Sequence, residues 1–128
     1  MIKDKMTDEC LHIFEENHDQ AHELGFYWRN AHKIIDKIKE ETAEVEEAIQ
    51  ENDENHLKEE LGDLIHAVFS LCRHYGFSPQ DVISQNNQKF QKRFDHMRRI
   101  MKENSMDSLN DQSLESLVKL WQQAKEEV

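Results

Sequence analysis

The sequence predicts an all-α protein, a bundle of four to five helices in one domain over residues 1–128. Only three glycines and one proline occur in the chain, too few for an all-β fold, which needs a turn roughly every eight to twelve residues. Charged residues make up 34% of the chain and apolar residues 37%, a balance typical of helices with one buried and one solvated face. Apolar side chains also recur at helical spacing in successive segments.

Capping signals delimit the first two helices. Thr7, followed by two acids, predicts a first helix over about residues 8–24, and Gly25 suits the left-handed conformation that ends it. Asn30 is a favoured N-cap for a second helix, which the polar run 51–55 ends. The apolar positions of this second helix are Ile34, Ile35, Ile38, Val45 and Ile49.

Three more helices are expected. The third extends over about residues 56–75, with Gly76 as its stop. A serine and a proline, residues preferred at the N-cap and the first helical position, start a fourth helix over about 79–103. Residues 104–112 are expected to form a loop before Ser113 caps the last helix. That helix carries Leu114, Leu117, Val118, Trp121 and Val128 as its apolar residues.

The charge of the chain narrows the choice of partners. There are 27 acidic and 16 basic residues, a net charge of −11, which opposes broad contact with nucleic acid or an anionic membrane. The sequence has no hydrophobic signal core and no apolar run near the ~18 residues of a membrane span, so we expect a cytoplasmic protein. Cys10 and Cys72 lie in helical apolar patterns and are expected to be buried rather than disulfide-bonded.

Four acids lie close to the predicted core. At about 100° per residue, Glu41 falls inside the apolar stripe of the second helix and Glu44 borders it. Glu60 and Asp63 share one flank of the third helix. If the two helices pack as an antiparallel hairpin, these carboxylates converge. Divalent cations neutralise such a group, and all-oxygen ligation favours Mg²⁺ or Mn²⁺ over Zn²⁺.

The alternative is that these acids are merely solvated, as most isolated ExxE pairs are. Three observations favour a metal site. The same i,i+3 spacing occurs on successive helices, and an unpaired charge inside an apolar face costs several kcal/mol. Gly62 lies inside the second pair and costs about 1 kcal/mol in a helix interior, which close approach of a backbone or ligand explains.

Polar and basic side chains also occupy predicted core positions further along the chain. Asn86, Lys89 and Arg93 fall within the apolar stripe of the fourth helix, and Trp121 and Lys125 form an i,i+4 pair on the face of the last helix expected to be inward. Long side chains that reach past a thin core are one explanation. Together with the acids, however, these groups favour a site that binds phosphate oxygens.

Three motifs then resemble, in order and spacing, the MazG family of all-α nucleoside triphosphate pyrophosphohydrolases. They are Lys37-Ile-Lys-Glu-Glu-Thr-Ala-Glu44, Glu59-Glu-Leu-Gly-Asp-Leu64 and Asn87-Gln-Lys-Phe-Gln-Lys-Arg-Phe94. The segments Gly25-Phe-Tyr-Trp28 and Leu120-Trp-Gln-Gln-Ala-Lys125 look like the flanks of the catalytic domain of two-domain members. The resemblance covers residues 20–126 and implies a stand-alone catalytic unit. It also implies an intertwined homodimer or a dimer of dimers.

The resemblance implies hydrolysis of a ribo- or deoxyribonucleoside triphosphate between the α and β phosphates, with Mg²⁺ as cofactor and Mn²⁺ as a possible substitute. Glu41, Glu44, Glu60 and Asp63 are then metal ligands. Lys89 and Arg93 bind the phosphates, and Lys37, Trp121 and Lys125 hold the nucleotide, with Asn86 beside them. Glu40 or Glu41 activates the water, and the sequence does not choose between these two. His66 replaces an aromatic residue common in the family.

Two other functions share some features with this sequence. A di-iron carboxylate bundle uses ExxH pairs on two different helices, whereas Glu9-x-x-His12 and Glu15-x-x-His18 both lie on the first helix. A non-catalytic helical interaction module leaves the charges within three apolar stripes unexplained.

Overall fold

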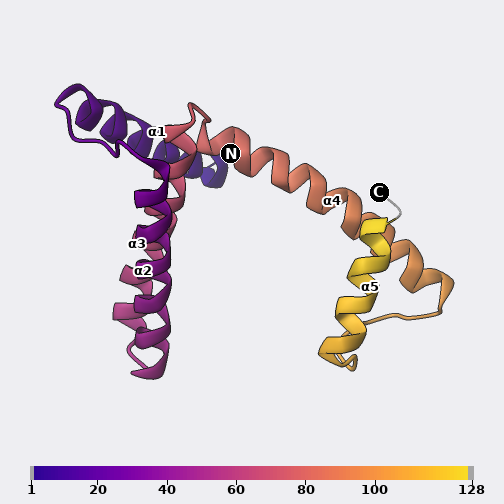
Figure 1. The fold of residues 1–128 in the computed structure, drawn as a ribbon. Coiled ribbons are helices and arrows are strands. Elements are labelled where there is room, and N and C mark those ends of the chain that lie inside the picture. The colour runs from indigo at the N-terminus through magenta and orange to yellow at the C-terminus, as the bar shows by residue number, and fades with distance from the viewer. Residues whose placement is uncertain (1, 127–128) are drawn as a thin grey trace. The chain divides into compact units, whose positions relative to one another are not determined.

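The computed structural model describes residues 2–126, which form five helices and no strand (Figure 1). The helices are α1 (Ile2–Glu23), α2 (Ala31–Gln50), α3 (Glu54–His74), α4 (Pro79–Glu103) and α5 (Leu114–Glu126). The all-α prediction is therefore confirmed, although Val128, expected on the last helix, lies outside the described residues. No helix in the described part is long and apolar enough to cross a membrane. The chain divides into two compact units, residues 1–82 and 83–128.

Helix α1 begins earlier than the sequence predicts. It starts at Ile2 instead of near residue 8, because residues 2–7 contain neither glycine nor proline to interrupt a helix and Thr7 is tolerated in a helix interior. Its end is as predicted. Gly25 has a φ of 87°, and the N–H of Phe26 donates to the carbonyl of Ala21 at 2.8 Å, which closes a left-handed cap.

Helices α2 and α3 form an antiparallel hairpin, the arrangement on which the expected convergence of the four acids depends (Figure 1). Asn30 caps α2 by accepting a 2.7 Å hydrogen bond from the N–H of His32. Asp53 caps α3 by accepting one of 3.1 Å from the N–H of His56, so α3 starts two residues before the expected position. Ile34, Ala48 and Ala67 are buried in this hairpin.

Helix α1 contacts the second half of α3 within the first unit. The ring of Phe14 meets His66 and Phe69 edge-on, with centroids 5.0 and 5.3 Å apart. Further along both helices, Asp19 accepts a 2.7 Å hydrogen bond from the guanidinium of Arg73. Both cysteines are free, but Cys10 is exposed and Cys72 only partly buried. The predicted burial is therefore wrong for Cys10.

The second unit contains most of α4 together with α5. The hydroxyl oxygen of Ser113 accepts a 3.1 Å hydrogen bond from the N–H of Ser116, as expected for the cap of α5. Phe90 on α4 contacts Trp121 on α5, with ring centroids 5.3 Å apart. Ile100 and Ala124 are the buried apolar residues of this unit.

Candidate functional site

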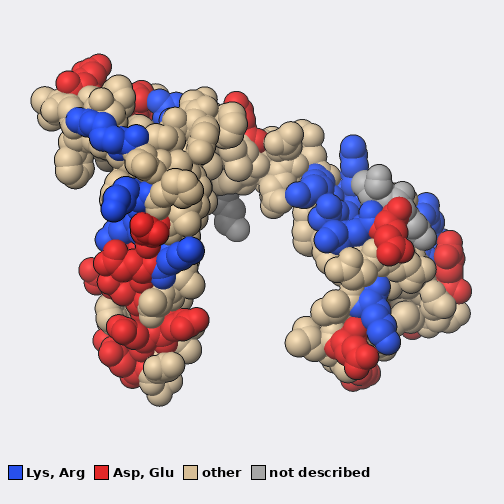
Figure 2. Space-filling view, in the orientation of Figure 1, with Lys and Arg blue, Asp and Glu red and all other residues tan. Residues whose placement is uncertain are grey.

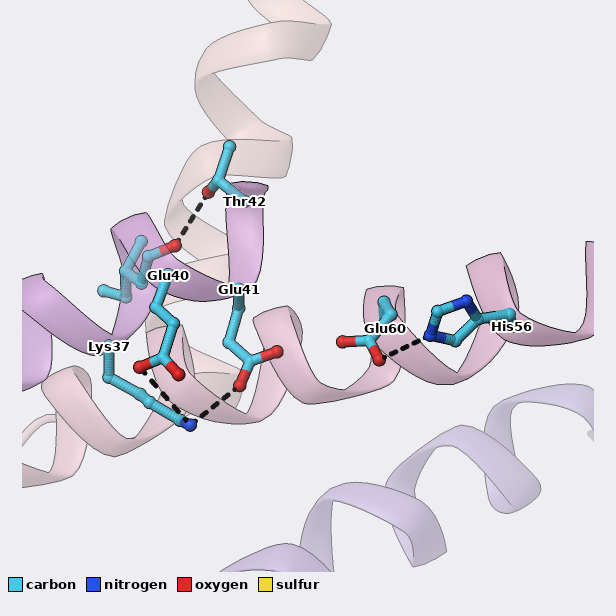
Figure 3. A network of polar contacts seen from close by, with 7 residues as sticks. Lys37, Glu40, Glu41, Thr42, His56 and Glu60 are labelled. Carbon is cyan, nitrogen blue, oxygen red and sulfur yellow. Dashed lines mark hydrogen bonds and ion pairs between the residues drawn. The ribbon is translucent and has the colours of Figure 1, made fainter. Parts of the chain in front are cut away.

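Two buried carboxylates face each other across the α2–α3 hairpin (Figure 3). Glu41 on α2 is 4% exposed and Glu60 on α3 is 8% exposed. With the exposed Asp63, they form the acidic cluster: each of the three has a carboxylate oxygen within 4.8 Å of those of the other two. The hairpin thus brings three of the four predicted metal ligands together.

Each buried carboxylate has one oxygen held within its own helix. Oε1 of Glu41 lies 3.0 Å from Nζ of Lys37, and Oε1 of Glu60 lies 3.1 Å from Nε2 of His56 (Figure 3). The second oxygen, Oε2, of both glutamates is buried and accepts no hydrogen bond from any described residue. An unsatisfied buried charged group costs more than the roughly 1–3 kcal/mol of a neutral one, so both oxygens suit a cation between the helices.

Glu44, the fourth predicted ligand, is partly buried beside the acidic cluster. Its contacts with Glu60 and Glu41 raise its pKa from 4.5 to about 7, because neighbouring carboxylates disfavour a further negative charge. The hydrogen bond from Lys37 lowers the pKa of Glu41 and raises that of Lys37. Without a cation, Glu41 thus keeps its charge while Glu44 holds a proton near neutral pH.

The donor set fits Mg²⁺ or Mn²⁺. All the converging ligand atoms are carboxylate oxygens, which hard divalent cations prefer. In the described part of the chain, no other group of three or more potential ligand side chains converges in this way. The ExxH pairs of α1 therefore do not assemble a metal site, and His12 pairs instead with Glu16 at 3.0 Å.

His56 is a residue of the site that sequence reasoning missed. It contacts Glu60 at 3.1 Å and, through Nδ1, Glu51 at 3.5 Å. Desolvation lowers the pKa of His56, but its contacts with these two acids outweigh this effect and raise the pKa overall. The i,i+4 spacing of His56 and Glu60 was the available signal.

Glu40 and Glu41 differ sharply in environment although they are neighbours on α2. Glu40 is exposed, and its Oε2 lies 3.7 Å from Nζ of Lys37. Lys37 therefore spans both glutamates (Figure 3). The hydroxyl of Thr42 donates to the carbonyl of Ile38 at 2.8 Å.

The predicted phosphate-binding residues lie in the second unit, on α4. Asn86 and Lys89 are exposed, not part of a core stripe as predicted. The reason is that only part of this stripe is covered: Phe90 is itself 51% exposed, whereas Ile100 is buried. Arg93 is partly buried, and its Nε has no hydrogen-bond partner among the described residues. Lys89 and Arg93 are four residues apart, so they share one side of α4.

The predicted nucleotide-binding pair on α5 is divided between two environments. Trp121 is partly buried against Phe90, whereas Lys125 is exposed, so the inward position predicted for Lys125 is wrong. Ala124 takes the buried position at this end of α5.

The two kinds of charged side chain gather on different units. Figure 2 shows acidic side chains along the α2–α3 hairpin and basic side chains on the second unit.

Comparisons with known proteins identify the family of this chain. A family model for the MazG nucleotide pyrophosphohydrolase domain matches residues 29–98. The chain is 33% identical over 104 residues to the nucleoside triphosphate pyrophosphohydrolase of Escherichia coli strain K12, covering 80% of this chain and 39% of that protein. It is 30% identical over 107 residues to the nucleoside triphosphate pyrophosphohydrolase/pyrophosphatase MazG of Thermotoga maritima, covering 84% of this chain and 40% of that protein. The chain thus spans about two fifths of the length of these relatives.

Proposed function

Because this chain belongs to the MazG nucleotide pyrophosphohydrolase family, we propose that it hydrolyses ribo- or deoxyribonucleoside triphosphates between the α and β phosphates. The products are the nucleoside monophosphate and pyrophosphate. The feature that supports this activity most directly is the acidic cluster, in which two buried glutamates each keep one oxygen without a donor. A non-catalytic helical module has no need of such a pair, since burying it unpaired is unfavourable.

Glu41, Glu44, Glu60 and Asp63 hold Mg²⁺, or Mn²⁺ in its place. When bound, such an ion neutralises phosphate oxygens and makes a coordinated water more acidic. Lys37 and His56 orient the two buried carboxylates by holding one oxygen of each. This leaves the other oxygens directed between the helices.

Glu40 is the better placed of the two glutamates considered for activating the attacking water. Glu41 has one oxygen on Lys37 and the other buried in the acidic cluster, where it is assigned to the cation, so neither oxygen is left to take a proton. The carboxylate of Glu40 is exposed and only loosely paired, at 3.7 Å from Lys37. We therefore assign Glu40 as the general base and Glu41 as a ligand.

Substrate capture is assigned to cations on the second unit. A protein of net charge −11 repels a triphosphate at long range, so local positive groups must attract it. Lys89 and Arg93 on one side of α4 bind phosphate oxygens, and the unpartnered Nε of Arg93 leaves it a donor for this purpose. Asn86, Lys37, Trp121 and Lys125 complete the substrate-binding residues.

A second copy of the chain covers the exposed apolar face of α3 in this proposal. Leu61, Ile65 and Val68 follow one another at helical spacing and are 41–52% exposed. A two-fold axis sets such a face against itself, giving a homodimer, intertwined or paired into a dimer of dimers. Light scattering at micromolar concentration should give at least twice the mass of one chain, and the mass of a single chain would contradict this assembly.

The partner is thus a nucleotide rather than a nucleic acid or a membrane, because the net charge opposes both polyanionic surfaces. We place the activity in the cytoplasm, where nucleoside triphosphates are available.

Product analysis tests the proposed reaction. Ion-exchange chromatography should find monophosphate and pyrophosphate with Mg²⁺ and neither with EDTA. Diphosphate and orthophosphate as products would refute attack at the α-phosphorus.

A further inference from the structure

The positive charge of the chain is concentrated on α4. Residues 83–128, the second unit, hold eight of the 16 basic residues but seven of the 27 acidic ones. Within this unit, residues 89–102 contain six basic residues and a single acidic one, Asp95. Figure 2 shows basic side chains gathered on the second unit. A positive surface on a chain of net charge −11 favours an anionic ligand at that surface.

Four of these basic residues form a stripe along one side of α4. At about 100° per residue they fall within about 120° of one another, and they are Lys89, Lys92, Arg93 and Arg99, here called the basic stripe. All are exposed except Arg93, which is partly buried. Like charges three or four residues apart destabilise a helix, and a bound anion removes this repulsion.

The basic stripe is longer than the triphosphate assigned to it. Lys89 and Arg93, which bind phosphates in the proposed function, are one turn apart, about 6 Å along the axis at 1.5 Å per residue. This length matches three linked phosphates. Arg99 lies about 9 Å further along the axis than Arg93, so it is beyond the reach of a triphosphate held by the first two cations.

Arg99 can still take part in binding a phosphate. Its Nε is 3.9 Å from Oε1 of Glu103, and both side chains are exposed. An exposed ion pair at this distance is weak, so a phosphate oxygen can replace the carboxylate. A planar guanidinium also binds phosphate oxygens through two parallel hydrogen bonds.

A phosphate chain suits the basic stripe better than single-stranded nucleic acid does. Binding of single strands relies on aromatic side chains beside the cations, on which the bases stack. The two phenylalanines of α4, Phe90 and Phe94, lie on another side of the helix and stack on each other, with ring centroids 5.7 Å apart. A phosphate chain carries charge on every unit and needs no such surface.

We propose that the basic stripe binds a linear chain of more than three phosphates, free or attached to a nucleoside. The proposal rests on the proposed function, since Lys89 and Arg93 are its phosphate-binding residues. With a nucleoside tetraphosphate, water attacks the α-phosphorus and Glu40 takes its proton. The bond from this phosphorus to the oxygen that bridges it to the β-phosphorus breaks, which gives the monophosphate and tripolyphosphate.

Calorimetry with inorganic chains tests binding without hydrolysis. Pyrophosphate, tripolyphosphate and tetrapolyphosphate are titrated into the protein in metal-free buffer at fixed ionic strength, where the acidic cluster repels all three. Tetrapolyphosphate should bind at least about twofold more tightly than tripolyphosphate, within the range of one exposed ion pair. Equal affinities would overturn the proposal. So would tighter binding of an oligodeoxythymidylate of the same charge, because a nucleic acid would then be the better ligand.

Arg99→Gln and Arg98→Gln form a matched pair, because each removes one positive charge from neighbouring exposed positions. Arg98 projects from the side opposite Lys89, with its guanidinium 4.4 Å from the ring centroid of Phe94. Arg99→Gln should abolish the gain from three to four phosphates and leave the affinity for pyrophosphate unchanged. Arg98→Gln should keep the gain. Equal effects of the two variants would show that net charge alone attracts the chain and would overturn the proposal.

Nucleotides then distinguish the two sources of the chain. The kcat/KM for a nucleoside tetraphosphate is compared, with Mg²⁺, with that for the triphosphate of the same nucleoside. A higher value that Arg99→Gln removes and Arg98→Gln keeps identifies the nucleotide as the ligand. The gain with inorganic chains alone identifies the free chain.

The proposal and the proposed function fail separately. If tetrapolyphosphate binds as described but no nucleotide is cleaved, the basic stripe stands and the proposed function fails. If triphosphates are cleaved but neither inorganic chains nor nucleotides show the gain with a fourth phosphate, the assignment of the basic stripe fails alone.

Discussion

Glu41 on α2 and Glu60 on α3 are buried opposite each other, and in each carboxylate only one of the two oxygens has a partner. Oε1 of Glu41 is held by Lys37 and Oε1 of Glu60 by His56, each partner one helical turn earlier, while Oε2 of both lacks a donor among the described residues. Each helix thus orients its own carboxylate, and the hairpin sets the two against each other. This divides the site into ligands and the residues that hold them.

Glu41→Gln should separate stability from catalysis. The substitution removes a buried charge that repels the neighbouring Glu44 and Glu60, so the melting temperature of the metal-free protein should stay the same or rise, because the relieved repulsion and desolvation together offset the lost contact with Lys37. Turnover should be abolished and stabilisation by Mg²⁺ weakened. Thermal unfolding with and without Mg²⁺ measures this, with Glu46→Gln, at an exposed position of the same helix, as the control. A fully active Glu41→Gln enzyme would remove Glu41 from the ligand set.

Arg93→Ala should leave metal binding intact and weaken nucleotide binding. The acidic cluster is unchanged in this variant, so stabilisation by Mg²⁺ alone should persist. The further stabilisation by a non-hydrolysable α,β-analogue should shrink by roughly 1.5–3 kcal/mol, the contribution of a hydrogen bond to a charged group. Lys92→Ala, at the exposed neighbouring position, should lose less. Equal loss of both responses in Arg93→Ala would contradict the separate roles of α2 and α4.

The parts of the site that the sequence could predict are those governed by local spacing. Glu41 inside an apolar stripe, and two acid pairs on helices joined by a short turn, are enough to predict convergence once a hairpin is assumed. The start of α1 was mispredicted because a residue favoured at caps, Thr7, also fits a helix interior. The exposure of Lys89 depends on which surfaces cover α4, and no periodicity within α4 contains that information.

His56→Ala should lower the affinity for Mn²⁺ by about tenfold, the lower end of what loss of a residue that orients a metal ligand costs. Without the 3.1 Å contact to His56, the Glu60 side chain samples orientations that do not face Glu41. Electron paramagnetic resonance of free Mn²⁺ measures the affinity without reference to activity. His56→Gln, which can still donate to Glu60, should recover part of the loss, and His32→Ala, at an exposed position, should have no effect. Unchanged affinity in His56→Ala would mean that Glu60 needs no positioning.

Gly62 and Gly76 should respond to the same substitution with opposite signs. Gly62 is in the interior of α3, and a Cβ added there meets nothing within 4 Å outside its own helical backbone, so no close backbone in the described part of the chain accounts for it. Gly62→Ala should therefore stabilise the protein by about 1 kcal/mol. Gly76 has a φ of 77°, where alanine is strained, so Gly76→Ala should destabilise by about 1 kcal/mol or more. Urea denaturation measures both. Destabilisation by Gly62→Ala would show that a second chain packs against this position.

The metal-free protein should lose stability as the pH rises, because of Glu44. Its pKa is about 7 in the folded chain against an ordinary value of 4.5, so between these values the folded state binds a proton that the unfolded state does not. By linkage, the stability contributed by Glu44 is fully present below about pH 4.5 and is lost as the pH rises through 7.

Glu44→Gln cannot titrate, so the melting temperature of this variant in EDTA, relative to that of the wild type, should increase from pH 5 to pH 8. The same difference should not change for Glu47→Gln, at an exposed position of α2. Mg²⁺ favours the ionised carboxylate and should therefore stabilise the wild type more at pH 8 than at pH 6. A difference between wild type and Glu44→Gln that stays constant across this range would show that Glu44 does not share the charge of the acidic cluster.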